Sequence, residues 1–122
     1  MKKLFLVMVI VLFTGGMLSA EGINLKNFPV GEWLDTNYSA VWEFTSNNIR
    51  ILSPEGKVHF DFSEQGVQDF SVSMEGGKPV MSFKSEAARR TYKFTKPVTN
   101  MNIILEIDAP WNRNYKVEMQ KQ

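Results

Sequence analysis

The chain has 122 residues, of which 43% are hydrophobic and 22% charged, enough for one domain with its own core and too few for two. Its 14 basic and 13 acidic residues nearly cancel, which excludes the strong positive field of proteins that bind nucleic acid or anionic membranes. The sequence contains no cysteine, so disulfide scaffolds, thiol nucleophiles and cysteine-ligated metals are excluded as well.

The start of the chain has the organisation of an export signal. A basic beginning precedes an apolar run at residues 4–13, and Leu18 and Ala20 occupy the −3 and −1 positions of a small-residue cleavage site. An uncleaved membrane anchor is the alternative, but the run is shorter than the ~20 residues that a spanning helix needs. We therefore predict a signal peptide at residues 1–20 and one domain at 21–122. Cleavage removes two lysines and changes the net charge from +1 to −1, giving a periplasmic or secreted protein without a stable membrane anchor.

Beyond the signal, apolar and polar residues alternate with period two, which is typical of strands with one buried face. A first strand is expected near Gly31–Asp35, and turn signals separate eight further runs. These runs lie at 40–45, 49–51, 58–62, 70–74, 81–83, 92–94, 101–107 and 115–119. Their regular spacing favours an antiparallel meander, because sequence neighbours can pair through tight links. Short strands hide their edges in a sandwich or in a closed barrel.

A Gly-x-Trp motif at Gly31–Trp33 follows a short apolar segment and precedes the series of strands. This arrangement resembles the start of the lipocalins and of the wider calycin superfamily, in particular a small exported bacterial member. The resemblance implies an all-β, eight- to nine-stranded antiparallel up-and-down barrel whose closed end is plugged by Trp33. Lipocalins stack an arginine from the end of the last strand on this tryptophan, and here Lys121 is the nearest cation. The chain lacks the C-terminal helix and the later Thr-Asp-Tyr segment of that family.

Large side chains dominate the inward phase of the predicted strands. An eight-stranded barrel is just wide enough for such side chains or for one small ligand. We favour a mostly filled core, with any cavity at one mouth and lined mainly by apolar groups. The candidate ligand-lining residues are the inward aromatic and methionine side chains: Trp42, Phe44, Phe60, Phe70, Met74, Met81, Phe83, Tyr92 and Phe94.

Two loops carry residue types that anchor protein partners. Arg89 and Arg90 stand in the charged segment 85–90, and Trp111 stands in a polar turn. Arginine and tryptophan are enriched among the residues that dominate protein–protein binding. The alternatives are a solvated connector for the arginines and a barrel-end cap for Trp111. Residues 85–92 are also loosely similar to a loop of the periplasmic c-type lysozyme inhibitors, which are small eight-stranded barrels.

The sequence offers little for catalysis. His59 is the single histidine and is expected on the solvent face, where it has no second histidine or cysteine to share a metal. The carboxylates are expected to be solvated, on outward phases or at strand ends: Glu32, Asp35, Glu43, Asp61, Glu64, Glu106 and Asp108. We predict a non-enzymatic binding protein for a small apolar or amphipathic ligand, with no cofactor, metal or nucleic acid. The alternative is a protein-binding module such as a periplasmic lysozyme or protease inhibitor.

Overall fold

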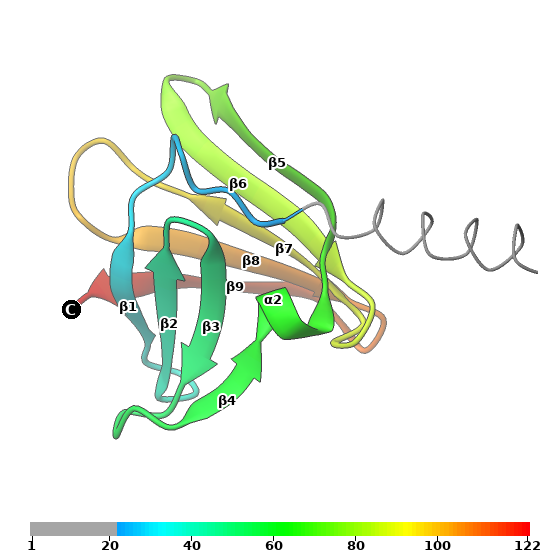
Figure 1. Ribbon diagram of the computed structural model, residues 1–122. Helices are drawn as coiled ribbons and strands as arrows, with labels where there is room; N and C mark the ends of the chain where they lie inside the picture. Colours follow the sequence, from blue (N-terminus) through cyan, green and yellow to red (C-terminus); the bar gives the residue numbers. More distant parts are fainter. Residues whose placement is uncertain (1–21) are drawn as a thin grey trace, which may run out of the picture.

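The computed structural model describes residues 22–122, and their side chains except those of residues 112–114. The predicted signal peptide lies outside the described residues. The described residues form nine strands and one short helical turn, arranged as in Figure 1. Their bounds are β1 Gly31–Asp35, β2 Ala40–Thr45, β3 Asn48–Leu52, β4 Val58–Asp61, α2 Phe62–Gln65, β5 Gln68–Glu75, β6 Lys78–Ser85, β7 Arg90–Thr95, β8 Ile103–Ala109 and β9 Asn112–Lys121. No helix in this part of the chain is long and apolar enough to cross a membrane.

All nine strands belong to one antiparallel sheet. Each strand pairs with its neighbours in sequence, except that β4 and β5 do not pair with each other. β1 also pairs with β9, which gives the order β4-β3-β2-β1-β9-β8-β7-β6-β5. The sheet is strongly curled, so one face encloses the interior (Figure 1). The predicted all-β meander is confirmed, including its first strand at Gly31–Asp35. The curl stops short of full closure, because β4 and β5 form the two edges of the sheet and leave a seam between them.

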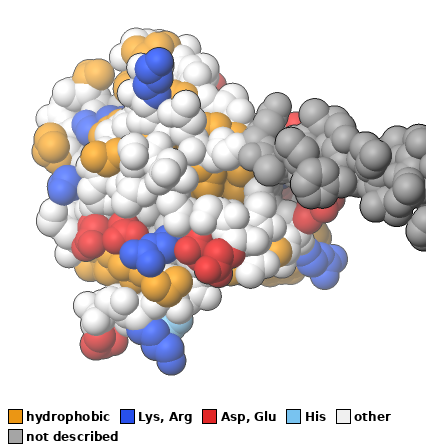
Figure 2. All heavy atoms as spheres, viewed as in Figure 1, with side chains coloured by type: hydrophobic (Ala, Val, Ile, Leu, Met, Phe, Trp, Pro, Cys, Tyr) orange, Lys and Arg blue, Asp and Glu red, His pale blue; other side chains and the backbone are white. Residues whose placement is uncertain are grey.

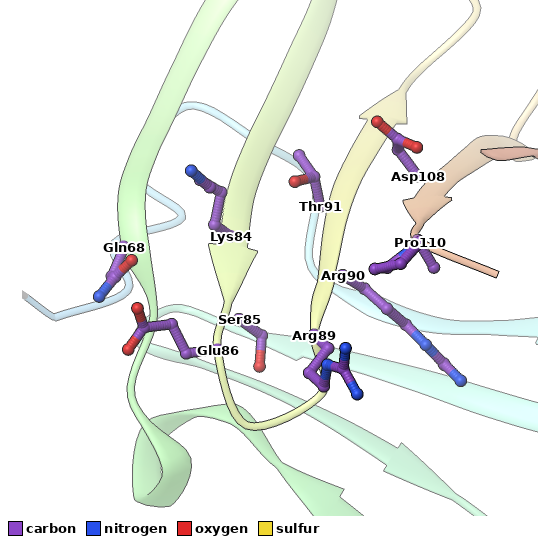
Figure 3. A pocket seen from close by; sticks show the side chains of 10 residues that line it. Gln68, Lys84, Ser85, Glu86, Arg89, Arg90, Thr91, Asp108 and Pro110 are labelled. Carbon is purple, nitrogen blue, oxygen red and sulfur yellow. The ribbon is translucent and has the colours of Figure 1, made fainter. Parts of the chain in front are cut away.

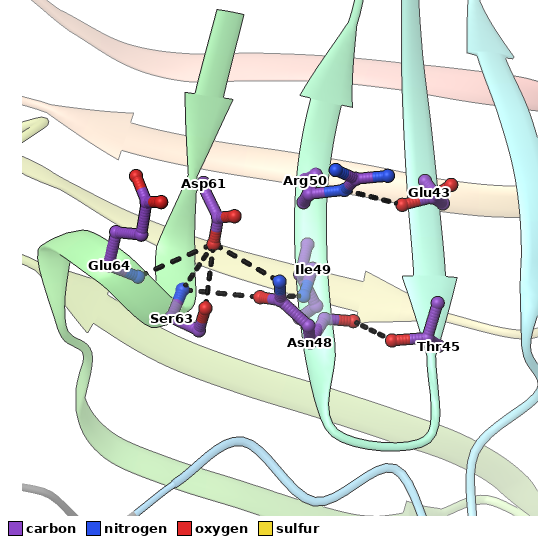
Figure 4. A network of polar contacts seen from close by, with 8 residues as sticks. All are labelled: Glu43, Thr45, Asn48, Ile49, Arg50, Asp61, Ser63 and Glu64. Carbon is purple, nitrogen blue, oxygen red and sulfur yellow. Dashed lines mark hydrogen bonds and ion pairs between the residues drawn. The ribbon is translucent and has the colours of Figure 1, made fainter. Parts of the chain in front are cut away.

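A change from strand to helix at Asp61 fills this seam. The carboxylate of Asp61 caps α2 by accepting hydrogen bonds from the backbone N–H groups of Ser63 and Glu64, and also from the Asn48 amide (Figure 4). The predicted strand at 58–62 therefore ends one residue early, and Phe62 opens the helical turn. Phe62 is fully buried, and its ring packs at centroid distances of 4.6–5.7 Å against four aromatic rings: Trp42, Phe60, Phe83 and Tyr92. Packing by this ring closes the seam where backbone pairing does not.

The outer face of β1–β4 is polar. A cross-strand row places Glu32, Glu43, Arg50 and Asp61 on paired residues of the four strands. The guanidinium Nε of Arg50 lies 2.7 Å from a carboxylate oxygen of Glu43. Acidic and basic side chains alternate across this side of the molecule (Figure 2). The solvent face of this half of the sheet thus follows the polar phase of the sequence pattern.

The segment before β1 covers one end of the half-barrel. Its side chains Ile23, Leu25 and Phe28 are buried, and the Leu25 N–H donates to the carbonyl of Ser46 in the β2–β3 turn. Figure 1 shows this blue segment crossing the end where the β2–β3 and β7–β8 connections lie. The end is therefore covered by chain rather than open to solvent.

Trp33 lies inside this covered end. Its side chain is fully buried, and the indole N–H donates a 2.8 Å hydrogen bond to the carbonyl of Met101 in the β7–β8 loop. The ammonium of Lys121 lies 5.3 Å from the centre of the Trp33 ring, within range of a cation–π interaction. Gly31 has φ +136°, and a Cβ there would come within 3.2 Å of the Lys121 side chain. The glycine thus permits both the backbone conformation and the close approach of the lysine.

Candidate ligand site

A pocket of about 260 Å³ opens at the other end of the half-barrel, where the β1–β2, β6–β7 and β8–β9 turns meet. We call it the mouth pocket. The residues that line it are Asp35, Tyr38, Ala40, Trp42, Ile51, Arg90, Ile107, Ala109, Trp111 and Tyr115. They come from six strands and two turns, so the pocket exists only in the curled sheet.

Aromatic rings form the floor and the rim of the mouth pocket. Trp42 is nearly fully buried, and its ring packs on Phe62 and Tyr92 of the filled core. Tyr38 and Tyr115 face each other with ring centres 5.5 Å apart. Trp111 stands at the rim with 57% of its surface exposed. A ligand body in this pocket would therefore meet apolar and aromatic surface while water could still reach its outer end.

A buried carboxylate forms one polar wall. Asp35 was expected to be solvated at a strand end, but this expectation is wrong: only 2% of Asp35 is exposed. One of its oxygens accepts a 2.7 Å hydrogen bond from the Tyr115 hydroxyl, and the other accepts one from the backbone N–H of Asn37. Asp35 is buried because it follows Trp33 on the inward phase of β1, and the two hydrogen bonds compensate for its desolvation.

Tyr115 is held in its protonated form. Burial, and then the hydrogen bond to Asp35, raise the pKa of the Tyr115 hydroxyl to about 12. The Asn37 side-chain amide donates to the same hydroxyl at 3.1 Å and acts in the opposite direction. The hydroxyl therefore remains a hydrogen-bond donor to Asp35 at neutral pH, and this pair of side chains gives the pocket a fixed polar edge.

Arg90 is the basic residue of the mouth pocket. Its guanidinium carbon lies 5.2 Å from the centre of the Trp111 ring, and that of Arg89 lies 5.9 Å from the same ring. The Nε of Arg90 is buried and has no hydrogen-bond partner within the described part of the chain. Burial raises the pKa of the neighbouring Tyr92 hydroxyl, and the Arg90 guanidinium acts against that shift. Arg90 therefore reaches inward from the start of β7 towards the ring layer at the pocket floor.

A second and larger hollow, of about 480 Å³, lies on the outer side of the β6–β7 turn (Figure 3). Its lining mixes both signs of charge, with Lys84 and Arg89 beside Glu86 and Asp108. Among the described residues, no aromatic side chain lines this hollow, and Ala109 and Pro110 are the apolar residues of its lining. We therefore place the candidate site in the smaller mouth pocket, which has aromatic walls.

The structure separates the predicted lining residues into four groups. Trp42 lines the mouth pocket, whereas Phe44, Met81, Phe83, Tyr92 and Phe94 are fully buried in the core. Phe60 and Phe70 are half-buried against that core, and Met74 is 64% exposed near the tip of the β5–β6 hairpin. The interior is thus filled by ring packing, and the free volume lies at the mouth.

The turn residues singled out in the sequence lie together at the mouth. Arg90 and Trp111 line the pocket, and Arg89 stands beside Trp111. Arg89 lies in the β6–β7 turn and Trp111 in the β8–β9 turn, 22 positions apart in the sequence. Sequence reasoning missed Asp35 and did not single out Tyr115. Asp35 lies on the same inward phase of β1 as Trp33, and Tyr115 lies on the same inward phase of β9 as Met119. The inward phase was the signal that could have identified both residues.

His59 is exposed on β4. Across the described residues, no group of three histidine or acidic side chains is arranged to hold a metal ion. Comparisons with protein-family models, with curated proteins and with solved structures give no match to this chain. The function therefore has to be argued from the mouth pocket itself.

Proposed function

We propose that the protein binds a small amphipathic molecule in the mouth pocket and does not transform it. The observation that carries this proposal is a pocket of about 260 Å³ with aromatic walls, next to an interior that is otherwise filled by ring packing. Ligand sites are typically concave and mostly apolar, with a few placed polar groups. Asp35 and Arg90 supply those groups here.

The size of the pocket limits the ligand. Sites for drug-sized molecules run from roughly 300 to 1,000 Å³, so a pocket of about 260 Å³ suits a smaller body. A long acyl chain would have to enter the core, where rings such as Phe83 and Phe94 leave no exposed surface. The proposal is therefore a compact ligand with one apolar part, carried by an exported calycin-like protein.

The proposal can be tested with a neutral fluorescent probe, N-phenyl-1-naphthylamine, titrated into the purified protein. We expect saturable binding at one site, weakened at least fivefold by Tyr38→Ala or Trp111→Ala. Met74→Ala is the matched control, because Met74 is also an exposed apolar side chain but lies outside the mouth pocket. Absence of binding, or equal weakening by all three variants, would refute the proposal.

One observation favours a second function, the docking of a partner protein at the same rim. Trp111 is exposed and has Arg89 and Arg90 beside its ring, and these residue types dominate binding energy at protein interfaces. A c-type lysozyme is the partner to test first. Inhibition of its activity that is lost in Trp111→Ala and in Arg89→Ala would support this function, whereas unchanged lysozyme activity at a large excess of the protein would rule out this inhibitor function.

A further inference from the structure

We infer that the ligand of the mouth pocket is a small organic carboxylate whose charged group is held by Arg90 and whose apolar body lies between the aromatic walls. This inference rests on the proposed function, since it names the ligand class of the same pocket. It depends on the hydrogen bonding and charge of Arg90, Asp35 and Arg89.

The first step is the unmet hydrogen-bonding capacity of Arg90. Its buried Nε–H has no acceptor among the described residues. Buried donors without an acceptor are uncommon in folded proteins, because losing water without a replacement is costly. A guanidinium presents its N–H groups in a planar fork that matches the two oxygens of a carboxylate. An acceptor with that geometry, arriving from the pocket, would complete the hydrogen bonds of this side chain.

The second step is that no acid of the pocket neutralises Arg90. Asp35 is the acidic residue in the lining, and its two oxygens already accept from Tyr115 and Asn37. The ion pairs found among the described side chains are Arg50–Glu43 and Lys93–Glu75, so no described carboxylate lies within 4.0 Å of the Arg90 nitrogens. The charge of Arg90 is therefore left for a ligand.

The third step concerns the sign of the local charge. Arg89 and Arg90 both lie beside the Trp111 ring, which holds a guanidinium in place without cancelling its charge. Two positive groups at the rim favour an anion over a cation of the same shape. The aromatic rings of Trp42, Tyr38 and Trp111 would then contact the uncharged part of the ligand.

The test uses three probes with nearly the same shape: 3-phenylpropanoate, 3-phenylpropanamide and 3-phenylpropylammonium. Binding to the purified protein is measured by isothermal titration and by quenching of tryptophan fluorescence. We expect the carboxylate to bind at least tenfold more tightly than the amide, and the ammonium to bind most weakly. The preference should fall as ionic strength rises, because part of it is a charge interaction.

Variants then identify the group that is responsible. Arg90→Gln should reduce the carboxylate-to-amide ratio to about one-tenth of its wild-type value or less, and Arg90→Lys should restore it only partly, because lysine keeps the charge but loses the planar fork. Lys78→Gln is the matched control, because Lys78 is an exposed cation outside the mouth pocket, and it should change the ratio less than threefold. Circular dichroism and thermal unfolding of each variant show whether the fold is retained.

The outcomes separate this inference from the proposed function. Equal binding of the carboxylate and the amide to the wild-type protein, or tighter binding of the ammonium, would overturn the carboxylate assignment while leaving a binding pocket. A preference that survives Arg90→Gln would overturn the role of Arg90. Failure of all three probes and of the neutral naphthylamine to bind would overturn both proposals. The wild-type comparison does not depend on any variant folding.

Discussion

Replacing Phe62 by alanine tests whether this ring closes the seam between β4 and β5. The side chain is fully buried, and four aromatic rings surround it at 4.6–5.7 Å. Phe→Ala changes in cores cost about 3–5 kcal/mol, from lost burial and from the cavity that remains. Because backbone pairing does not hold the seam together, we expect a loss of about 4 kcal/mol in the free energy of unfolding. That is a large part of the roughly 5–15 kcal/mol by which single domains are stable.

The assay is equilibrium unfolding in urea, followed by tryptophan fluorescence and by far-ultraviolet circular dichroism. Phe70→Ala is the matched control, since Phe70 is half-buried on the other edge strand and has one ring neighbour, Phe83, at 6.3 Å. Partial burial predicts a loss of only about 1 kcal/mol there. If Phe62→Ala does not fold, Phe62→Leu keeps most of the volume and should cost about 1–2 kcal/mol.

The reasoning would be refuted if Phe62→Ala cost less than about 1.5 kcal/mol, the lower bound for burying such a side chain, or no more than Phe70→Ala. Either result would mean that the seam is held by other contacts, or that β4 and β5 approach each other in solution. A change in the slope of free energy against urea would instead indicate a change in the surface exposed on unfolding.

Three further predictions concern single side chains. Gly31→Ala should cost about 1–3 kcal/mol in thermal unfolding because of its φ of +136°, whereas Gly22→Ala, with no atom within 4 Å of the added Cβ, should cost much less. Burial acts to raise the pKa of the Asp61 carboxyl, but the hydrogen bonds that this carboxyl accepts outweigh burial and lower its pKa. The stabilisation that ionised Asp61 gives to the fold is therefore present above the ordinary pKa of 3.8 and is lost as the pH falls through the lower pKa of the folded state. Urea unfolding between pH 2 and 6 should show that loss in the wild type and not in Asp61→Asn. Ultraviolet titration at alkaline pH should show Tyr115 ionising near pH 12, and nearer its ordinary value in Asp35→Asn; an unchanged titration would contradict the role of Asp35.

The sequence by itself determined the strands and their order. Alternation is a local property, so the inward phase of each run predicts which side chains are buried, as Phe44, Phe83 and Phe94 are. Short turns between the runs favour pairing of sequence neighbours, and the observed meander follows from that. Asp35 and Arg90 also lie on the inward phase of their strands, but Asp35 was predicted to be solvated because it stands at a strand end.

Only the tertiary structure decided where the sheet remains open and which turns share a mouth. Whether β4 and β5 pair depends on the twist summed over nine strands and on the helical turn that Asp61 caps, neither of which is encoded by alternation alone. The approach of Arg90 to Trp111 and of Asp35 to Tyr115 joins segments that are distant in sequence. Those contacts follow from how far the sheet curls, and curl is a collective property of side-chain packing between the two halves of the sheet.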